Sequence, residues 1–265
     1  MAVYMHCNFR SVVLQMSVDV SILLPEQDRV RQFTERTKNP VKYQTLYLLH
    51  GFTGDYLSYL RTSNIENYAD EHQIVVVMPS VYNSAYTDMK YGLDYFTYLS
   101  EELMDFVERT FPSSPRREDR FVAGMSMGGY GAYKLGLSCP DKFSAIGGIA
   151  GSYHAEYRYH GKVSTVSTLC EALYGDPPAL TPEIHDIFTM LKNLVENGVE
   201  LPRMYTCCGY EDRRYQDSVD LKEFADQLGI ALKFEHDHGK HDTIFFDKYI
   251  QRILDWMNFA GGPVE

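Results

Sequence analysis

The amino-acid sequence predicts an α/β fold in which a mostly parallel central sheet is covered by helices on both faces. β-rich segments alternate with segments of helical spacing along the 265 residues, as in chains built from strand–helix–strand units. Two of them, IVVVMPS (74–80) and FSAIGGIAG (143–151), are almost continuously apolar, which is typical of parallel strands buried on both faces. No linker, repeat or low-complexity segment divides the chain, so we expect a single domain over residues 1–265.

In the first half of the chain, the sequence predicts a hairpin followed by strands that alternate with helices. The β-rich segments lie at 9–16 and 17–25, which form the hairpin, and at 43–50 and 74–80. The polar residues 26–42 are expected to be a connection, and residues 64–73 a short helix. Apolar residues at helical spacing predict a long helix over 95–111, with Pro112 just beyond its end.

The second half of the chain continues the alternation, with one interruption. Strands are expected at 120–124, 143–151, 203–209 and 230–237. Helices are expected after residue 126 through about residue 137, and at 183–198, 218–229 and 243–259. Residues 152–182 break this rhythm with Tyr, His, Ser and Pro. We therefore expect a small cap-like insertion at about 152–182.

Charge and cysteine content restrict the partners and the compartment. The net charge is −11, and an acidic surface repels phosphate backbones, so nucleic acid is not an expected partner. No stretch reaches the length of about 18 apolar residues that a membrane helix needs, and the N-terminus lacks the pattern of a signal peptide. The five cysteines are scattered without zinc-site spacing, which favours reduced and mostly buried thiols. We expect a cytoplasmic protein without a membrane partner.

The segment GMSMG (124–128) matches G-x-S-x-G between a predicted strand and a predicted helix. In an α/β-hydrolase fold this sharp turn holds the serine in a strained backbone conformation and exposes its hydroxyl. Side chains at Gly124 or Gly128 would clash, and the Met127 N–H at the helix start could stabilise negative charge on a reacting carbonyl. By itself the pattern also fits a glycine-rich turn with an incidental serine. Ser126 is the candidate nucleophile if a base and an acid accompany it.

The partners of Ser126 are expected further along the chain, in the order carboxylate and then histidine. Asp212 follows the predicted strand 203–209, where a short carboxylate can be held rigidly. His241 follows Gly239 and comes just before the last predicted helix. Each candidate therefore stands at the carboxyl end of a predicted strand, so Ser126, Asp212 and His241 are predicted to meet at one edge of the sheet.

The other polar residues near Asp212 and His241 are expected to have structural roles and no role in the chemistry. Asp242 is expected to cap the last helix. Solvated loop or helix-start charges are expected at Glu211, Asp217 and Asp220, and surface side chains at His236 and His238. The H-x-H-x-x-H pattern of residues 236–241 could suggest a metal site, but it has no supporting carboxylate pattern. No metal and no organic cofactor is expected.

A second main-chain donor for an oxyanion is expected after an early strand. The segment LLHGFTG (48–54) supplies it, because the N–H of Phe52 can point toward the site. With Met127, Phe52 completes the expected pair of backbone donors. His50 is expected to hold this loop and to take no part in the chemistry.

Four segments together resemble a known family. LLHGFTGD, GMSMGGYGA, CGYED and GKHDTIFFD occur in order over roughly residues 10–257. The chain resembles the esterase D-like branch of the α/β-hydrolases, which includes S-formylglutathione hydrolases and antigen 85 mycolyltransferases, and it is most similar to the bacterial tributyrin esterase and feruloyl esterase group. The resemblance implies Ser126 as nucleophile, Asp212 as acid, His241 as base, and Phe52 and Met127 as oxyanion donors.

Two departures from the family pattern bear on the substrate. Tyr210 stands where the tributyrin esterase group usually has threonine, which would alter the pocket wall. The cysteine that S-formylglutathione hydrolases usually carry after their HG is missing from HGFTGDY (50–56).

The expected function is a serine carboxylesterase that hydrolyses short-chain acyl or aryl esters of the tributyrin, acetyl or feruloyl type through an acyl-enzyme. The alternative is a thioesterase resembling S-formylglutathione hydrolase, or an acyltransferase, with the same triad. A complete triad disfavours a non-catalytic binding protein. The expected partner is a small-molecule ester, with acylated sugars among the candidates, and the sequence leaves a homo-oligomer open.

Overall fold

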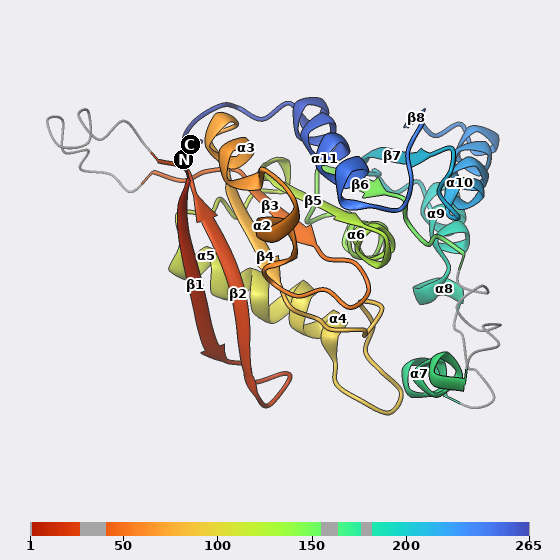
Figure 1. The fold of residues 1–265 in the computed structure, drawn as a ribbon, viewed down its shortest axis with the longest axis horizontal. Coiled ribbons are helices and arrows are strands. Elements are labelled where there is room, and N and C mark those ends of the chain that lie inside the picture. The colour runs from red at the N-terminus through yellow and green to blue at the C-terminus, as the bar shows by residue number, and fades with distance from the viewer. Residues whose placement is uncertain (1, 27–40, 155–163, 176–181, 265) are drawn as a thin grey trace, which may run out of the picture.

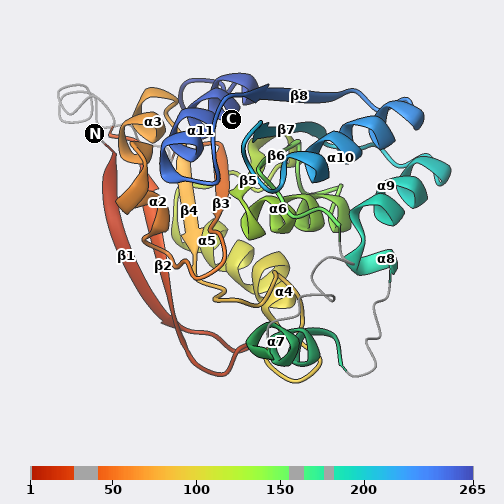
Figure 2. The ribbon, with the colours of Figure 1, turned by 45° about the vertical axis from the view of Figure 1, so that its right-hand side comes forward.

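The computed structural model describes residues 2–26, 41–154, 164–175 and 182–264. The predicted connection at 26–42 therefore lies largely outside the described residues, as do 155–163 and 176–181 of the predicted cap-like insertion. Figure 1 shows a central sheet with helices packed around it, and Figure 2 shows the same layers turned by 45°. None of the described helices is long and apolar enough to cross a membrane.

Eight strands form the sheet in the order β1-β2-β4-β3-β5-β6-β7-β8. Their bounds are β1 Val3–Arg10, β2 Ser17–Leu24, β3 Thr45–Leu49, β4 Val75–Pro79, β5 Arg120–Met125, β6 Ala145–Ile149, β7 Arg203–Gly209 and β8 Leu232–Asp237. The pairs β1·β2 and β2·β4 are antiparallel, and all pairs from β4 to β8 are parallel. The predicted mostly parallel sheet is confirmed.

Helices cover both faces of the sheet. The bounds are α2 Ser58–Thr62, α3 Ile65–Glu71, α4 Tyr95–Thr97, η1 Tyr98–Leu103, α5 Met104–Thr110, η2 Arg117–Asp119, α6 Met127–Ser138, α7 Ser164–Tyr174, α8 Pro182–His185, α9 Ile187–Glu196, α10 Tyr215–Gln227 and α11 Thr243–Met257. One face packs against α4 to α6, α9 and α10, and the other against α2, α3 and α11.

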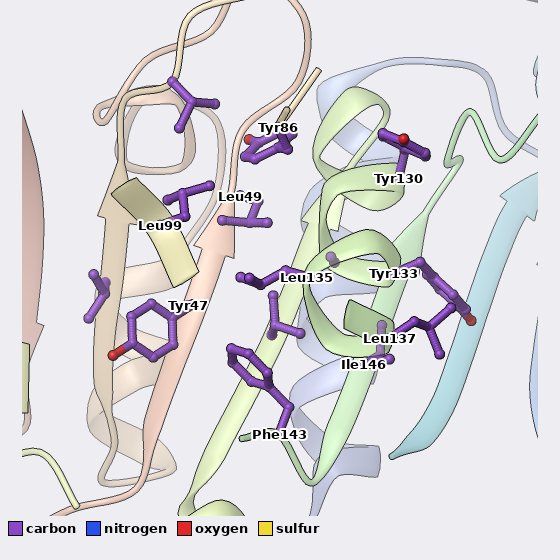
Figure 3. Packing of buried hydrophobic residues seen from close by; sticks show 14 of the residues in the cluster. Tyr47, Leu49, Tyr86, Leu99, Tyr130, Tyr133, Leu135, Leu137, Phe143 and Ile146 are labelled. Atoms are coloured by element: carbon purple, nitrogen blue, oxygen red, sulfur yellow. The ribbon is translucent and has the colours of Figure 1, made fainter. Parts of the chain in front are cut away.

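Residue alternation along the buried strands divides the core into these two layers. In β3, Tyr47 and Leu49 belong to the cluster under α6, while Leu46 and Leu48 belong to the cluster under α11. All four side chains are at most 1% exposed, which explains why this strand reads as a continuous apolar run. Figure 3 shows the first layer, where α6 side chains pack against β3 and β6.

Three predicted elements differ from the observed ones. The first hairpin strand is Val3–Arg10, and residues 11–16 form the turn. Apolar and polar residues alternate along this strand, but the prediction followed the apolar run at 12–14 instead. The helix predicted over 183–198 is broken at Asp186, whose carboxylate accepts a hydrogen bond from Thr189 N–H and caps α9. The long helix over 95–111 is continuous but has a π-helical turn at Tyr98–Leu103.

Candidate active site

Ser126 lies on a tight turn between β5 and α6. Its φ of 56° and ψ of −116° are rare for a residue with a side chain, and its N–H donates to the Ile149 carbonyl oxygen at 2.8 Å. The backbone around Ser126 is therefore strained, and the neighbouring strand β6 holds it in place. The predicted strand–turn–helix context of the G-x-S-x-G motif is present.

The flanking glycines are required by space. A Cβ atom at Gly124 would lie 2.2 Å from the Gly128 carbonyl oxygen, and one at Gly128 would lie 2.1 Å from the Leu49 carbonyl oxygen. Both contacts are with main chain, which cannot move aside as the end of a flexible side chain can. The predicted clash at these positions is confirmed.

Ser126, His241 and Asp212 form a continuous hydrogen-bonded chain. His241 Nε2 lies 2.8 Å from Ser126 Oγ, and His241 Nδ1 lies 2.7 Å from Asp212 Oδ2. A carboxylate can only accept, so Nδ1 carries the hydrogen and Nε2 accepts from the serine hydroxyl. The structure brings together three side chains from the loops that follow β5, β7 and β8.

Local contacts hold the two partners of Ser126. The Asp212 side chain is fully buried, and its Oδ1 accepts a hydrogen bond from Arg214 N–H at 2.8 Å. The His241 ring is 22% exposed and lies edge-on to Phe246, with ring centroids 5.1 Å apart. The Asp242 carboxylate accepts from Phe245 N–H at 3.0 Å, as predicted for the cap of the last helix.

The loop after β3 lies against the serine. A Cβ atom at Gly51 would lie 3.5 Å from Ser126 Cβ, so the main chain that leads into Phe52 is adjacent to the hydroxyl. Within the described part of the chain, no acceptor binds the Phe52 N–H. Met127 is the first residue of α6, where an N–H has no acceptor within its own helix. The segment that leads into Phe52 and the first residue of α6 therefore both lie next to Ser126.

His50 anchors this loop from inside the protein. It is 1% exposed, its Nδ1 donates to the Gly51 carbonyl oxygen at 2.7 Å, and its Nε2 accepts from Val81 N–H at 3.1 Å. Burial lowers the pKa of His50, more than the hydrogen bond to Gly51 raises it. A neutral ring that links the loops after β3 and β4 agrees with the predicted structural role.

Backbone strain is concentrated around these loops. Nine described residues other than glycine have positive φ, and six of them follow the carboxyl ends of β3 to β6. The six are Thr53, Tyr82, Ala85, Tyr86, Ser126 and Ala150. Such conformations persist where surrounding structure enforces them, and they cluster at active sites.

Several polar residues near the triad differ from their predicted surroundings. Asp217 is 4% exposed and pairs with Arg214, and burial raises its pKa. The Asp220 carboxylate lies 2.7 Å from His154 Nε2. The prediction of a solvated charge was wrong for Asp217, because sequence alone does not show how α10 packs. Asp220 is partly exposed, with a side-chain exposure of 30%.

Tyr210 lies beside the end of β8 and the loop that follows it. Its ring is near those of His236 and His238, with centroids 5.0 and 5.3 Å away, and the residue is 45% exposed. The structure therefore places this departure from the family pattern beside the loop that carries His241. No signal in the sequence pointed to this contact.

Outside the site, a groove of about 500 Å³ lies at the amino ends of β7 and β8. Val199, Pro202 and Ile230 are among the residues that line it, and none of the triad residues does. Among the described residues, no group of three His, Cys, Asp or Glu side chains could hold a metal ion.

Comparisons with known proteins agree over nearly the whole chain. The family model Esterase, described as "Putative esterase", matches residues 11–228. An acetyl esterase from Caldicellulosiruptor saccharolyticus is 30% identical over 270 residues, which cover 96% of this chain and 97% of that protein.

Two solved structures from Staphylococcus aureus are also similar. The first is the substrate-bound fluorophosphonate-binding serine hydrolase F, FphF, with a TM-score of 0.89 and 33% identity over 97% of this chain and 98% of that one. The second is the S-formylglutathione hydrolase FrmB without ligand, with a TM-score of 0.86 and 32% identity over 97% of this chain and 99% of that one.

Proposed function

Because the chain belongs to the esterase family whose model it matches, we propose that it hydrolyses short-chain acyl or aryl esters with Ser126, His241 and Asp212 as its catalytic triad. Family membership confirms the predicted resemblance to the esterase D-like group and the α/β-hydrolase fold. The protein is a serine hydrolase of carboxylic esters. The substrate and the roles of individual residues are the proposal.

One observation carries the residue assignment: the hydrogen-bonded chain from Ser126 Oγ through the His241 ring to the buried Asp212 carboxylate. His241 Nε2 takes the proton of the serine hydroxyl as Oγ attacks the ester carbonyl carbon. Asp212 holds the ring in the tautomer that leaves Nε2 free to accept, and it stabilises the imidazolium that forms. This arrangement needs no metal ion and no organic cofactor.

The main-chain N–H groups of Phe52 and Met127 stabilise the oxyanion of the tetrahedral intermediate. Phe52 follows Gly51, whose main chain lies next to Ser126, and Met127 follows Ser126 directly and adds the positive end of the α6 dipole. When the intermediate collapses, His241 returns its proton to the leaving alcohol and an acyl group remains on Ser126 Oγ. Water then attacks this acyl-enzyme with the same base, which releases the acid.

The acetyl esterase relative supports acetyl groups as the first acyl class to test. Acylated sugars and feruloyl esters are further candidates within the same reaction. The predicted cap-like insertion at 152–182 would set the acyl length. A panel of p-nitrophenyl esters of increasing chain length, together with sugar acetates and methyl ferulate, measures this preference as relative kcat/KM.

A second candidate is hydrolysis of a glutathione thioester, which the likeness to the S-formylglutathione hydrolase from S. aureus favours. The same triad serves either reaction, because both pass through an acyl-serine. Parallel measurement of kcat/KM with S-formylglutathione and with p-nitrophenyl acetate separates them, and the larger value identifies the preferred class.

Replacing Ser126 or His241 with alanine tests the triad. Each change removes a group that acts on the reacting atoms, so kcat for p-nitrophenyl acetate is expected to fall roughly 10³-fold or more. His236→Ala is the matched control, since this histidine contacts Tyr215 and not the triad, and its activity is expected to match the parent. Retention of activity by both triad variants would exclude the assignment.

A further inference from the structure

The loops after β7 and β8 are joined beyond the last residues of their strands. The strands pair in parallel as far as Gly209 and Asp237. Two main-chain hydrogen bonds continue the pairing, from Tyr210 N–H to the Asp237 carbonyl oxygen at 2.9 Å and from Glu211 N–H to the Gly239 carbonyl oxygen at 3.2 Å. The two loops therefore have a defined register next to the triad.

The Glu211 carboxylate adds two contacts between the loops after β7 and β8. Its Oε1 lies 2.7 Å from His238 Nδ1, and its Oε2 accepts a hydrogen bond from Gly239 N–H at 2.7 Å. Both partners belong to the loop that leads to His241, so a side chain of one loop holds two consecutive residues of the other. The next residue in the chain, Asp212, turns its carboxylate to the His241 ring instead.

Gly239 is enclosed by its neighbours. A Cβ atom at Gly209 would lie 2.1 Å from the Gly239 carbonyl oxygen, and a Cβ atom at Gly239 would lie 2.2 Å from Cδ2 of Phe245. His241 is only two residues further along. A displacement of Gly239 would consequently be transmitted to the imidazole, and small errors in the position of a catalytic group lower the rate strongly.

Glu211 and His238 each stabilise the charged form of the other. The hydrogen bond to His238, followed by that to Gly239, lowers the pKa of Glu211. The hydrogen bond to Glu211 raises the pKa of His238, and the negative charge of Asp237 on β8 adds to this. The two side chains are 44% and 84% exposed, and an ion pair so open to solvent contributes little to stability. The pair is therefore expected to hold the loop that leads to His241 in position and to add little to the free energy of unfolding.

We propose that Glu211 is a positioning residue for His241, because its carboxylate fixes the His241 loop through His238 and the Gly239 N–H. This inference rests on the proposed function, since it concerns the imidazole of the same triad. The two consecutive acidic residues after β7 therefore have different roles. Asp212 orients the ring of His241, and Glu211 fixes the main chain that carries it.

Kinetics of three variants test this role. Glu211→Ala is expected to lower kcat for p-nitrophenyl acetate about tenfold with KM changed less than about twofold, because the substrate contacts remain while the base is displaced. Glu211→Gln keeps an oxygen acceptor for the Gly239 N–H and is expected to recover most of the lost kcat. Glu200→Ala, which removes an exposed partner of Arg117, is the matched control and is expected to leave kcat unchanged.

Nuclear magnetic resonance titration of the His238 ring tests the contact itself. The pKa of His238 is expected to fall toward its ordinary value in Glu211→Gln, because the carboxylate charge that raises it is gone. An unchanged His238 titration would overturn the inference. A wild-type kcat in Glu211→Ala, or a change confined to KM, would overturn it as well.

Failure of the inference is separable from failure of the proposed function. Ser126→Ala, measured in the same assay, reports whether the triad carries the activity at all. If Ser126→Ala is inactive while Glu211→Ala matches the parent, the triad stands and the positioning role of Glu211 falls. If Ser126→Ala is fully active, the proposed triad falls, and the positioning role falls with it.

Discussion

Ser126 combines an unusual backbone conformation with a hydroxyl that reaches a histidine ring. The positive φ is enforced by the close approach of main-chain atoms at Gly124 and Gly128, where any Cβ atom would meet a carbonyl oxygen. At the residue scale, the strained turn and the hydrogen bond to His241 together fix the direction of the Ser126 hydroxyl. The hydroxyl projects from the turn toward the base, and the helix that follows begins with free N–H groups.

Gly128→Ala tests this steric account. The added Cβ would lie 2.1 Å from the Leu49 carbonyl oxygen, so the turn must shift, and a loss of roughly 1–3 kcal/mol in the free energy of unfolding is expected from overpacking. Activity is expected to fall as well, because Ser126 moves with the turn. Thermal unfolding and p-nitrophenyl acetate kinetics measure the two effects.

Gly262→Ala is the control for that substitution, because a Cβ atom at Gly262 would meet nothing within 4 Å. It is expected to unfold at the parent temperature and to keep full activity. If Gly128→Ala behaved like this control, the tight turn would not be what enforces the serine conformation.

At the scale of elements, the loop after β3 depends on a histidine that must stay neutral. His50 bridges Gly51 and Val81 through its two nitrogens, and one of these contacts requires Nε2 to accept a hydrogen bond. Protonation would turn that acceptor into a donor facing the Val81 N–H. The position of the Gly51 main chain beside Ser126 is consequently linked to the charge of a buried ring.

Lowering the pH is therefore expected to destabilise the protein in part through His50. Its folded pKa is lowered by burial, so the unfolded chain binds more protons as the pH falls below the ordinary value of about 6.5. The stability contribution of the neutral ring is present above that pH and is lost as the pH falls toward the folded pKa.

Comparison of unfolding temperatures at about pH 7 and about pH 5 measures this dependence. His50→Gln keeps a donor and an acceptor without a titrating group and is expected to lose less stability between the two pH values than the parent. The exposed His236→Gln is the control and is expected to keep the parental difference. An equal loss in His50→Gln and the parent would contradict the account.

At the scale of the whole molecule, the parallel strands place the site. The turns after β3, β5, β7 and β8 leave the sheet at the same edge, which brings Gly51, Ser126, Asp212 and His241 together although up to 190 residues separate the first from the last. This is why strand prediction and residue order alone anticipated the meeting of Ser126, Asp212 and His241.

The sequence was informative where burial on both faces leaves a pattern, as in Val75–Pro79 of β4 and Thr45–Leu49 of β3. It was uninformative where structure depends on distant partners. The burial of Asp217 depends on how α10 packs. The alternation of apolar and polar residues in β1, by contrast, is present in the sequence, and the prediction missed it. The Glu211–His238 contact joins two loops that are distant in the sequence, and the residues around each side chain predict only a solvent-exposed position.

Some predictions about the whole molecule stay predictions. These are the single domain over residues 1–265, the cap-like insertion, a cytoplasmic location and the roles assigned to the five site residues. None of the described cysteines forms a disulfide, and Cys170, Cys207 and Cys208 are buried.

Mass spectrometry of the protein after treatment with a fluorophosphonate probe tests the central claim most directly. A serine activated by His241 is expected to yield one adduct per chain, on the peptide that contains Ser126, with labelling absent in Ser126→Ala and strongly slowed in His241→Ala. An adduct on a different residue, or labelling of His241→Ala at the parental rate, would contradict the assignment.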